Sequence, residues 1–289
     1  IRDRSPSRGL GDVYKRQVKD RLGELEEQLW QWGAVSVSVV DAADSPIYEP
    51  APDELPIWAQ IMVTGLFGAE GPIESIKKDL IAKKFIDTRV VRIEDRVWER
   101  EWLHRFQPMR FGDGLWVCPS GFESPKGTVI KMDPGLAFGT GTHATTRLCL
   151  EYLDGLVVDG YSVLDYGCGS GVLGIGAALK GASSVLAVDN DPQALNATLD
   201  NAERNDVKVK VTMPDISIEP VDLVFANILA GPLVALSSTL LAATRPDGYL
   251  VLSGIMSSQK EWLLETYEEG GELIDLVELD GWVRLVWRC

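Results

Sequence analysis

The chain has 289 residues, 45% of them hydrophobic and 25% charged, which is the composition of a globular protein large enough for two domains. No run approaches the roughly 18 apolar residues that a membrane-spanning helix needs, and the polar start lacks the apolar core of a signal peptide, so we expect no membrane contact and a cytoplasmic location. The net charge of −15 argues against direct, sequence-specific nucleic-acid binding, which needs cations against phosphates; it favours a basic protein partner, although solubility alone explains it equally well.

The first 17 residues are rich in Arg, Ser and Gly and show no periodicity, so we expect a non-native or disordered segment there. Residues 18–94 then follow the order helix, strand, strand, helix, strand. The helices are expected at 18–32 and 72–84, and the strands at 34–40, 60–67 and 85–93. This order is that of a ferredoxin-like α+β unit without its opening strand, and the missing strand would fall within the first 17 residues. Residues 95–108 are expected to form a charged linker helix.

Residues 109–289 are expected to form a larger α/β domain. Two strands, within 111–120 and 127–133, precede a region in which strands and helices alternate. Its strands are expected at 162–166, 184–189, 207–212, 221–227 and 249–255, and its helices at 172–180, 192–205, 232–244 and 257–269. Alternation of this kind indicates a doubly wound, Rossmann-like parallel sheet. Residues 271–289 have the pattern of two strands joined at Asp280-Gly281, so we expect the sheet to close with an antiparallel hairpin.

A buried strand runs directly into a glycine-rich loop, residues 164–171, and a helix follows the loop. Gly167, Gly169 and Gly171 let the backbone approach a ligand closely, and the start of the helix adds N–H groups. The spacing is GxGxG, whereas dinucleotide-binding loops have GxGxxG. The tighter spacing favours S-adenosylmethionine, which has no pyrophosphate. A turn without a ligand is the alternative.

Acidic residues lie at the ends of this strand and the next. Asp189 ends the second strand, where an acid at a topological switch point can accept hydrogen bonds from both ribose hydroxyls. The alternative is that Asp189 only helps to cap the next helix, whose expected N-cap is Asp191. Asp165 either orients the glycine loop or is a solvated strand end. Cys168 is interpreted as a small filler between glycines and not as a nucleophile.

Two further segments carry candidate site residues. Residues 132–146 form a Gly/Thr-rich loop whose Gly139 and Thr140 are candidate cofactor contacts, able to close over the methionine carboxylate. His143 could be a base, but a lone His at a helix start more often has a structural role. Asn227 ends the fourth strand of the alternating region and faces the expected crevice. Its amide oxygen could accept a hydrogen bond from an amine and aim the nitrogen lone pair; a turn or cap is the alternative.

Cysteine and histidine usage gives no sign of a metal site. The four cysteines form no CxxC pair, and the chain has two histidines. We therefore expect neither a bound metal nor a disulfide framework.

Four segments together resemble the motif series of the ribosomal protein L11 methyltransferases: DPGLAFGTGTHATT, LDYGCGSG, VDNDPQAL and ANILAGP. The likeness extends from residue 18 to the end of the chain. The glycine loop is common to all class I methyltransferases, whereas GTGTH and NILAGP are more specific. The resemblance implies that residues 18–94 recognise the substrate, that 95–108 link the domains, and that 109–289 bind S-adenosylmethionine.

The resemblance also implies site residues and a partner. Carried onto matching positions, the cofactor ligands are Thr146, Gly167, Asp189 and Asn227. The family adds methyl groups to lysine side chains and the N-terminal amine of ribosomal protein L11, which would be the protein partner. We expect a monomer. The chain departs from the family pattern at its start, where the first strand of the recognition domain has no convincing counterpart.

Three other functions are alternatives to this one. An RNA or small-molecule methyltransferase could use the same sheet, but the acidity and the lack of a basic–aromatic stripe argue against RNA. A nicotinamide-dependent oxidoreductase predicts GxGxxG, which is absent. A binding module without catalysis is disfavoured by the intact run of motifs from Gly139 to Asn227.

Overall fold

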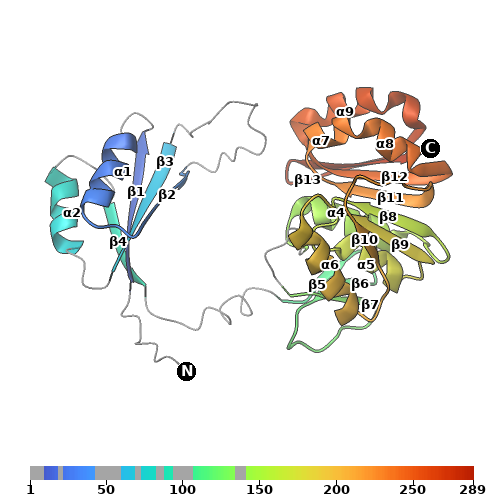
Figure 1. Ribbon diagram of the computed structural model, residues 1–289, viewed down its shortest axis with the longest axis horizontal. Coiled ribbons are helices and arrows are strands. Elements are labelled where there is room, and N and C mark those ends of the chain that lie inside the picture. The colour runs from blue at the N-terminus through green and yellow to red at the C-terminus, as the bar shows by residue number, and fades with distance from the viewer. Residues whose placement is uncertain are drawn as a thin grey trace. The chain divides into compact units, whose positions relative to one another are not determined.

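The computed structural model describes residues 10–18, 22–42, 60–68, 73–82, 88–93, 107–133 and 141–289. The chain divides into two compact units, Ile1–Trp98 and Glu99–Cys289, which are described separately below (Figure 1). The linker helix expected at 95–108 lies almost wholly outside the described residues.

Unit 1 contains a four-stranded antiparallel sheet in the order β2-β3-β1-β4, with two helices. Its elements are β1 Leu10–Val18, α1 Leu22–Gln31, β2 Ser36–Asp41, β3 Gln60–Phe67, α2 Ile73–Ala82 and β4 Thr88–Ile93. Both helices bury residues four apart, such as Leu25 and Leu29 on α1, while β3 buries alternate residues from Ile61 to Phe67. These two periodicities place one helix face and one sheet face in a common core.

β1 corrects the prediction that the opening strand is missing. Leu10–Val18 pairs antiparallel with β3 on one side and with β4 on the other, so it is an interior strand of the sheet. The prediction of a disordered segment was therefore wrong from residue 10 onward. Strand pairing uses backbone N–H and C=O groups, and two neighbouring strands can hold a segment whose side chains lack strict alternation.

Unit 2 is built on a seven-stranded sheet in the order β10-β9-β8-β11-β12-β14-β13. The strands are β8 Ser162–Tyr166, β9 Ser184–Val188, β10 Lys210–Thr212, β11 Val221–Asn227, β12 Thr244–Met256, β13 Glu272–Leu279 and β14 Trp282–Arg288. The first five pair in parallel, and β14 runs antiparallel to both β12 and β13. Asp280 and Gly281, which join β13 to β14, both have positive φ (51° and 78°), as a tight hairpin turn requires.

Helices cover both faces of this sheet (Figure 1). One group is α4 Ala144–Gly155, α5 Val172–Leu179 and α6 Pro192–Arg204; the other is α7 Ala230–Ala235, α8 Ser237–Ala242 and α9 Lys260–Thr266. Leu150 and Ile175 belong to one buried core, and Leu233 and Leu263 belong to a second core on the opposite face. Two separate cores follow from parallel strands that are apolar on both faces.

A small three-stranded sheet precedes these elements, in the order β5-β6-β7. Its strands are β5 Met109–Phe111, β6 Leu115–Cys118 and β7 Thr128–Lys131. Phe111, Leu115 and Ile130 are fully buried in the same core as α4 and α5. The small sheet is therefore part of unit 2. The two strands expected in this region correspond to β6 and β7, whereas β5 was not predicted and residues 112–114 form a turn.

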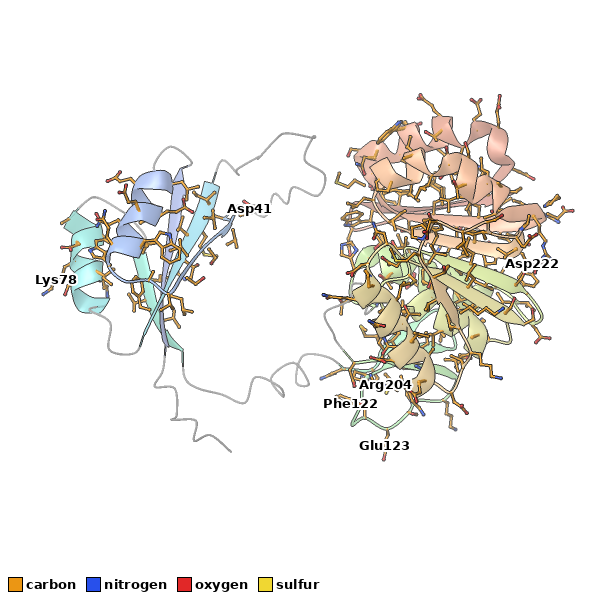
Figure 2. All side chains as sticks on the ribbon, viewed as in Figure 1. Asp41, Lys78, Phe122, Glu123, Arg204 and Asp222 are labelled. Atoms are coloured by element: carbon orange, nitrogen blue, oxygen red, sulfur yellow. The ribbon has the colours of Figure 1, made fainter. Side chains whose placement is uncertain are left out.

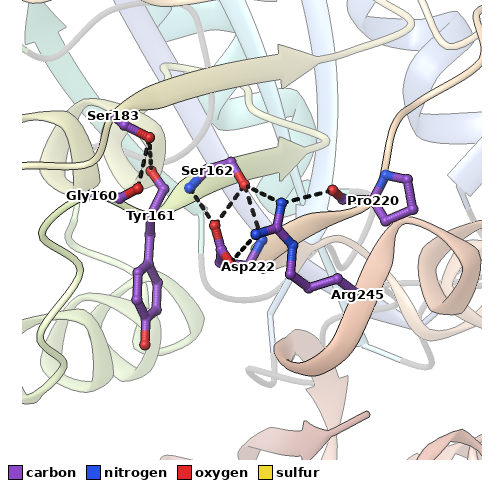
Figure 3. Close-up of polar contacts among 7 residues, drawn as sticks. All are labelled: Gly160, Tyr161, Ser162, Ser183, Pro220, Asp222 and Arg245. Atoms are coloured by element: carbon purple, nitrogen blue, oxygen red, sulfur yellow. Dashed lines mark hydrogen bonds and ion pairs between the residues drawn. The ribbon is translucent and has the colours of Figure 1, made fainter.

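A polar network joins the amino ends of three strands of the large sheet (Figure 3). Asp222 accepts hydrogen bonds from the Ser162 amide (2.8 Å) and hydroxyl (2.7 Å) and pairs with the Arg245 guanidinium at 2.5 Å. Arg245 also donates to the Ser162 hydroxyl and to the Pro220 carbonyl, both at 3.2 Å. We call Ser162, Asp222 and Arg245 the distal network, because it lies at the strand ends opposite the loops described next.

Among the described residues, no helix has the length and apolar character needed to cross a membrane.

Candidate functional site

The order of the strands creates a topological switch point at the carboxyl end of the sheet, where open α/β sheets form their ligand-binding crevice. β8 and β11 are neighbours, but the chain leaves β8 towards β9 on one side and leaves β11 towards β12 on the other. Ligands of open α/β sheets bind at such a switch point. Gly167 follows β8, Asp189 follows β9 and Asn227 ends β11, so three of the predicted site residues lie at the same edge of the sheet.

The glycine loop between β8 and α5 needs its glycines for geometric reasons. Gly167, Gly169 and Gly171 all have positive φ (74°, 54° and 78°), which side chains disfavour. A Cβ at position 167 would lie 2.2 Å from Cγ2 of Ile228, the residue after β11. The loop therefore packs directly against the segment that follows Asn227, and a larger residue would force the two apart.

Asp189 ties the loop to the end of β9. One carboxylate oxygen accepts a hydrogen bond from the Gly169 amide at 2.9 Å, and the other accepts one from the Asp191 amide at 3.0 Å. Each oxygen of an ionised carboxylate can accept a second bond, so acceptor capacity remains. The cap of α6 is Asp191, which accepts from the Gln193 amide at 2.8 Å, as the sequence predicts. Asp189 is thus not the side chain that caps this helix.

Asp165 lies beneath the loop and is only 2% exposed. Its carboxylate accepts a hydrogen bond from the amide of Gly174, in the first turn of α5, at 2.9 Å. Burial raises the pKa of Asp165 to about 7, opposed by the Gly174 hydrogen bond and reinforced by the charge of Asp189. Of the two sequence interpretations, the solvated strand end is wrong. The side chain holds the helix that follows the loop.

Asn227 and Thr146 meet beside this loop. The Asn227 amide nitrogen donates to the hydroxyl of Thr146 at 3.4 Å, and Thr146 is fully buried near the start of α4. The amide oxygen of Asn227 is also buried, yet it has no hydrogen-bond partner among the described residues. A buried acceptor without a donor costs about 1–3 kcal/mol and is rare in folded proteins. The Asn227 oxygen is therefore a candidate acceptor for an external donor.

His143 has a structural role, as the sequence analysis favours. It is the N-cap of α4, and its Nδ1 lies 2.8 Å from the Thr145 hydroxyl and accepts from the Thr145 amide at 3.4 Å. Its ring packs edge-on against Trp282 with centroids 4.8 Å apart, and burial lowers its pKa. The candidates Gly139 and Thr140, from the same segment, lie outside the described residues.

The buried face of α6 carries polar residues that the sequence analysis missed. Thr198 and Asn201 donate hydrogen bonds to carbonyl groups of the glycine loop, and Asn205 pairs with the backbone of Lys131 on β7. The signal was their spacing: these three residues are three and four positions apart, which places them on one helix face.

The described residues include neither a reactive thiol at Cys168 nor a cluster of side chains suited to a metal ion. Cys168 is buried in the glycine loop, where burial raises its pKa to about 12, so its thiol is not a nucleophile. No group of three or more His, Cys, Asp or Glu side chains within the described part of the chain is arranged to hold a metal ion.

Comparison of the chain with known proteins shows which family it belongs to. The family model described as Ribosomal protein L11 methyltransferase (PrmA) matches residues 15–289. Ribosomal protein L11 methyltransferases from Methylococcus capsulatus and Azotobacter vinelandii are 48% and 45% identical, each match covering 92% of this chain and 94% of the relative. The crystal structure of a ribosomal protein L11 methylase from Lactobacillus delbrueckii subsp. bulgaricus is similar, with a TM-score of 0.57 at 29% identity over 63% of this chain and 99% of that chain. The chain belongs to the ribosomal protein L11 methyltransferase family.

Proposed function

We propose that this chain transfers methyl groups from S-adenosylmethionine to amino groups of ribosomal protein L11, namely lysine side chains and the N-terminal amine. Membership of the family gives the reaction class and the cofactor. The observation that carries the proposal for the site is the buried, unpartnered amide oxygen of Asn227 at the switch point. It is an acceptor that an amine donor would satisfy.

The residues at the crevice fit S-adenosylmethionine. The ribose of this cofactor has two hydroxyl donors, and the Asp189 carboxylate retains acceptor capacity beyond its two backbone bonds. The loop from Gly167 to Gly171 has no side chain at three positions, so its backbone can approach the nucleoside closely. Thr146 adds a hydroxyl beside Asn227. We assign Thr146, Gly167, Gly169, Asp189 and Asn227 to cofactor binding on this basis.

Positioning is the main contribution required of the chain. S-adenosylmethionine, when bound, supplies a methyl group that is already activated by a sulfonium centre. The Asn227 oxygen would accept an N–H of the incoming amine and thereby fix the direction of its lone pair. The bond from Asn227 to Thr146 restricts rotation of the amide. Fixing a nucleophile in line with its target is a large source of rate enhancement.

The amine must be neutral to react. For a lysine of pKa about 10.4 the loss of its proton at pH 7 costs about 4.6 kcal/mol, whereas for an α-amine near 7.8 it costs about 1 kcal/mol. Burial of the amine beside the buried Asn227 oxygen would lower the amine pKa, because desolvation disfavours the charged form. The proton can leave to water. His143 is engaged as a helix cap and is not assigned as a base.

Unit 1 is proposed as the substrate-recognition domain. Its elements follow the order β1-α1-β2-β3-α2-β4, which is that of a ferredoxin-like fold. It has its own buried core, which includes Leu25, Ile61 and Leu80. A separately folded unit can bind a protein partner without disturbing the cofactor site of unit 2. The net charge of −15 is that of the whole chain, and it favours a basic partner for the protein as a whole.

Methyl transfer from tritiated S-adenosylmethionine tests the proposed function. The purified chain would be incubated with ribosomal protein L11 or with naked ribosomal RNA, and the product examined by mass spectrometry. We expect label on the protein, with mass increases on lysine residues and on the N-terminus. Label on the RNA alone would show that the chain is an RNA methyltransferase. Label on neither substrate, from a chain that binds the cofactor, would overturn the assignment of the substrate.

A further inference from the structure

Two buried side chains of α6 hold the glycine loop by its carbonyl groups. The Thr198 hydroxyl donates to the carbonyl oxygen of Gly169 at 3.1 Å, with the Cys168 sulfur of the same loop as a second acceptor at 3.3 Å. The Asn201 amide donates to the carbonyl oxygen of Ser170 at 2.9 Å. Thr198 is fully buried and Asn201 is 9% exposed. In a trans peptide the C=O and N–H bonds point in opposite directions, so each bond also fixes the direction of the following N–H group.

We propose that Thr198 and Asn201 are positioning residues for the methyl-transfer reaction. By drawing the Gly169 and Ser170 carbonyls towards α6, they orient two successive peptide groups of the loop that binds the cofactor. They act through the loop backbone and are not assigned contacts with the cofactor itself. The inference rests on the proposed function, because it requires S-adenosylmethionine to bind at this loop.

The packing of Thr198 against the loop supports this role. A Cβ at Gly171 would lie 2.7 Å from Cγ2 of Thr198 and 2.9 Å from its hydroxyl oxygen. The loop and the helix are therefore in close contact at this point. Valine, which has nearly the shape of threonine, would fill the same buried space at position 198 equally well. The hydroxyl has a further use, because valine could not donate the hydrogen bond that the Gly169 carbonyl oxygen accepts from Thr198.

α6 is itself anchored to the small sheet, so it gives the loop a fixed support. Asn205 accepts from the Lys131 amide at 2.7 Å and donates to the Lys131 carbonyl at 2.8 Å. Arg204, labelled in Figure 2 at the end of the helix, pairs with Asp133 at 3.0 Å. At the other end, the amide of Asp191, the N-cap residue, donates to the Asp189 carboxylate after β9 at 3.0 Å. A support fixed at both ends keeps the loop in one arrangement before the cofactor binds.

Isosteric replacement of the hydroxyl tests the proposal. Thr198→Val removes the donor and keeps the shape, Thr198→Ser keeps the donor, and Asn201→Ala removes the second bond. Calorimetric titration with S-adenosylhomocysteine gives the dissociation constant, and steady-state kinetics give KM for S-adenosylmethionine and kcat. We expect Thr198→Val and Asn201→Ala each to raise the dissociation constant and KM about three- to tenfold, with Thr198→Ser within about twofold of wild type.

Two controls separate positioning from general stability. Asn196→Ala changes an exposed position of the same helix, and Asp222→Asn loosens the distal network at the other end of the sheet. Both are expected to bind S-adenosylhomocysteine as the wild type does, even where Asp222→Asn lowers Tm as much as Thr198→Val does.

The outcomes distinguish this inference from the proposed function. Wild-type affinity in both Thr198→Val and Asn201→Ala would overturn the positioning role while leaving the function intact, as would an equal loss of affinity in Asp222→Asn. If Thr198→Val does not fold, Asn201→Ala decides the matter by the same criteria. Failure of the wild-type chain to bind S-adenosylhomocysteine would overturn the proposed function, and this inference with it.

Discussion

The Asp189 carboxylate accepts a hydrogen bond from the Gly169 amide at 2.9 Å, so one side chain joins the end of β9 to the glycine loop that follows β8. The same carboxylate is the proposed acceptor for the ribose hydroxyls. Asp189 therefore shapes the loop, and the proposed ribose contact would give it a second role connected with the first.

Asp189→Ala is expected to raise the dissociation constant of S-adenosylhomocysteine by about 10- to 100-fold, since hydrogen bonds to a charged group contribute about 1.5–3 kcal/mol. Isothermal titration calorimetry measures the effect. Asp191→Ala is the matched control: it removes the cap of α6 and should lower Tm with a much smaller change in affinity. Unchanged affinity in Asp189→Ala would remove the ribose assignment.

Asn227→Ala is expected to reduce kcat by about 100-fold, because a misdirected nucleophile loses most of the benefit of positioning. Its affinity for S-adenosylhomocysteine should change far less. Steady-state kinetics with ribosomal protein L11 and calorimetry on the same sample give both quantities. The reverse pattern, with lost affinity and preserved kcat, would show that Asn227 only binds the cofactor and does not orient the amine.

Asp165 should make the stability of the protein depend on pH. Its pKa in the folded protein is about 7, well above the ordinary value of 3.8, so folding favours the protonated form. The carboxyl therefore destabilises the fold most above pH 7, and this penalty declines as the pH falls towards 4. We expect Asp165→Asn to raise Tm by at least about 2 °C near pH 8 and by progressively less at lower pH. A difference in Tm that does not vary with pH would contradict this.

The distal network should stabilise unit 2 without affecting the cofactor site. Burial opposes ionisation of Asp222, but hydrogen bonds from Ser162 and the charge and hydrogen bond of Arg245 outweigh it and lower its pKa. Its stabilisation is therefore present above the ordinary carboxyl pKa and is lost as the pH falls through the depressed value.

Asp222→Asn should accordingly lower Tm by about 3–8 °C near neutral pH and by less under acidic conditions. Thermal denaturation followed by circular dichroism gives the shift. An equal shift at every pH would be inconsistent with a role for the ionised carboxylate.

The sequence predicted the structure best where an apolar segment is followed by residues that favour a turn or a helix cap. Strands such as Ser162–Tyr166 and Val221–Asn227 are mostly apolar, Gly167 follows the first and Asn227 ends the second, so both the strands and the site edge could be predicted. Asp191 was predictable as a cap because it precedes Pro192 at the first helical position. Local chemistry alone determines features of this kind.

Other features depend on neighbours that are distant in the sequence. The helix expected at 232–244 is two short helices, α7 and α8, with Leu236 at the junction, and β12 begins at Thr244, where it pairs with Val221. The strand at Leu10–Val18 has no clear alternation and is held by two partners. The role of Thr198 was missed because its carbonyl partner lies 29 positions away.

A crystal structure of the chain with S-adenosylhomocysteine would test the central claim most directly. The account predicts the nucleoside in the crevice between β8 and β11, with ribose hydroxyls on the Asp189 carboxylate and the sulfur facing the Asn227 amide oxygen. A ligand bound elsewhere, or bound here with its ribose turned away from Asp189, would contradict it.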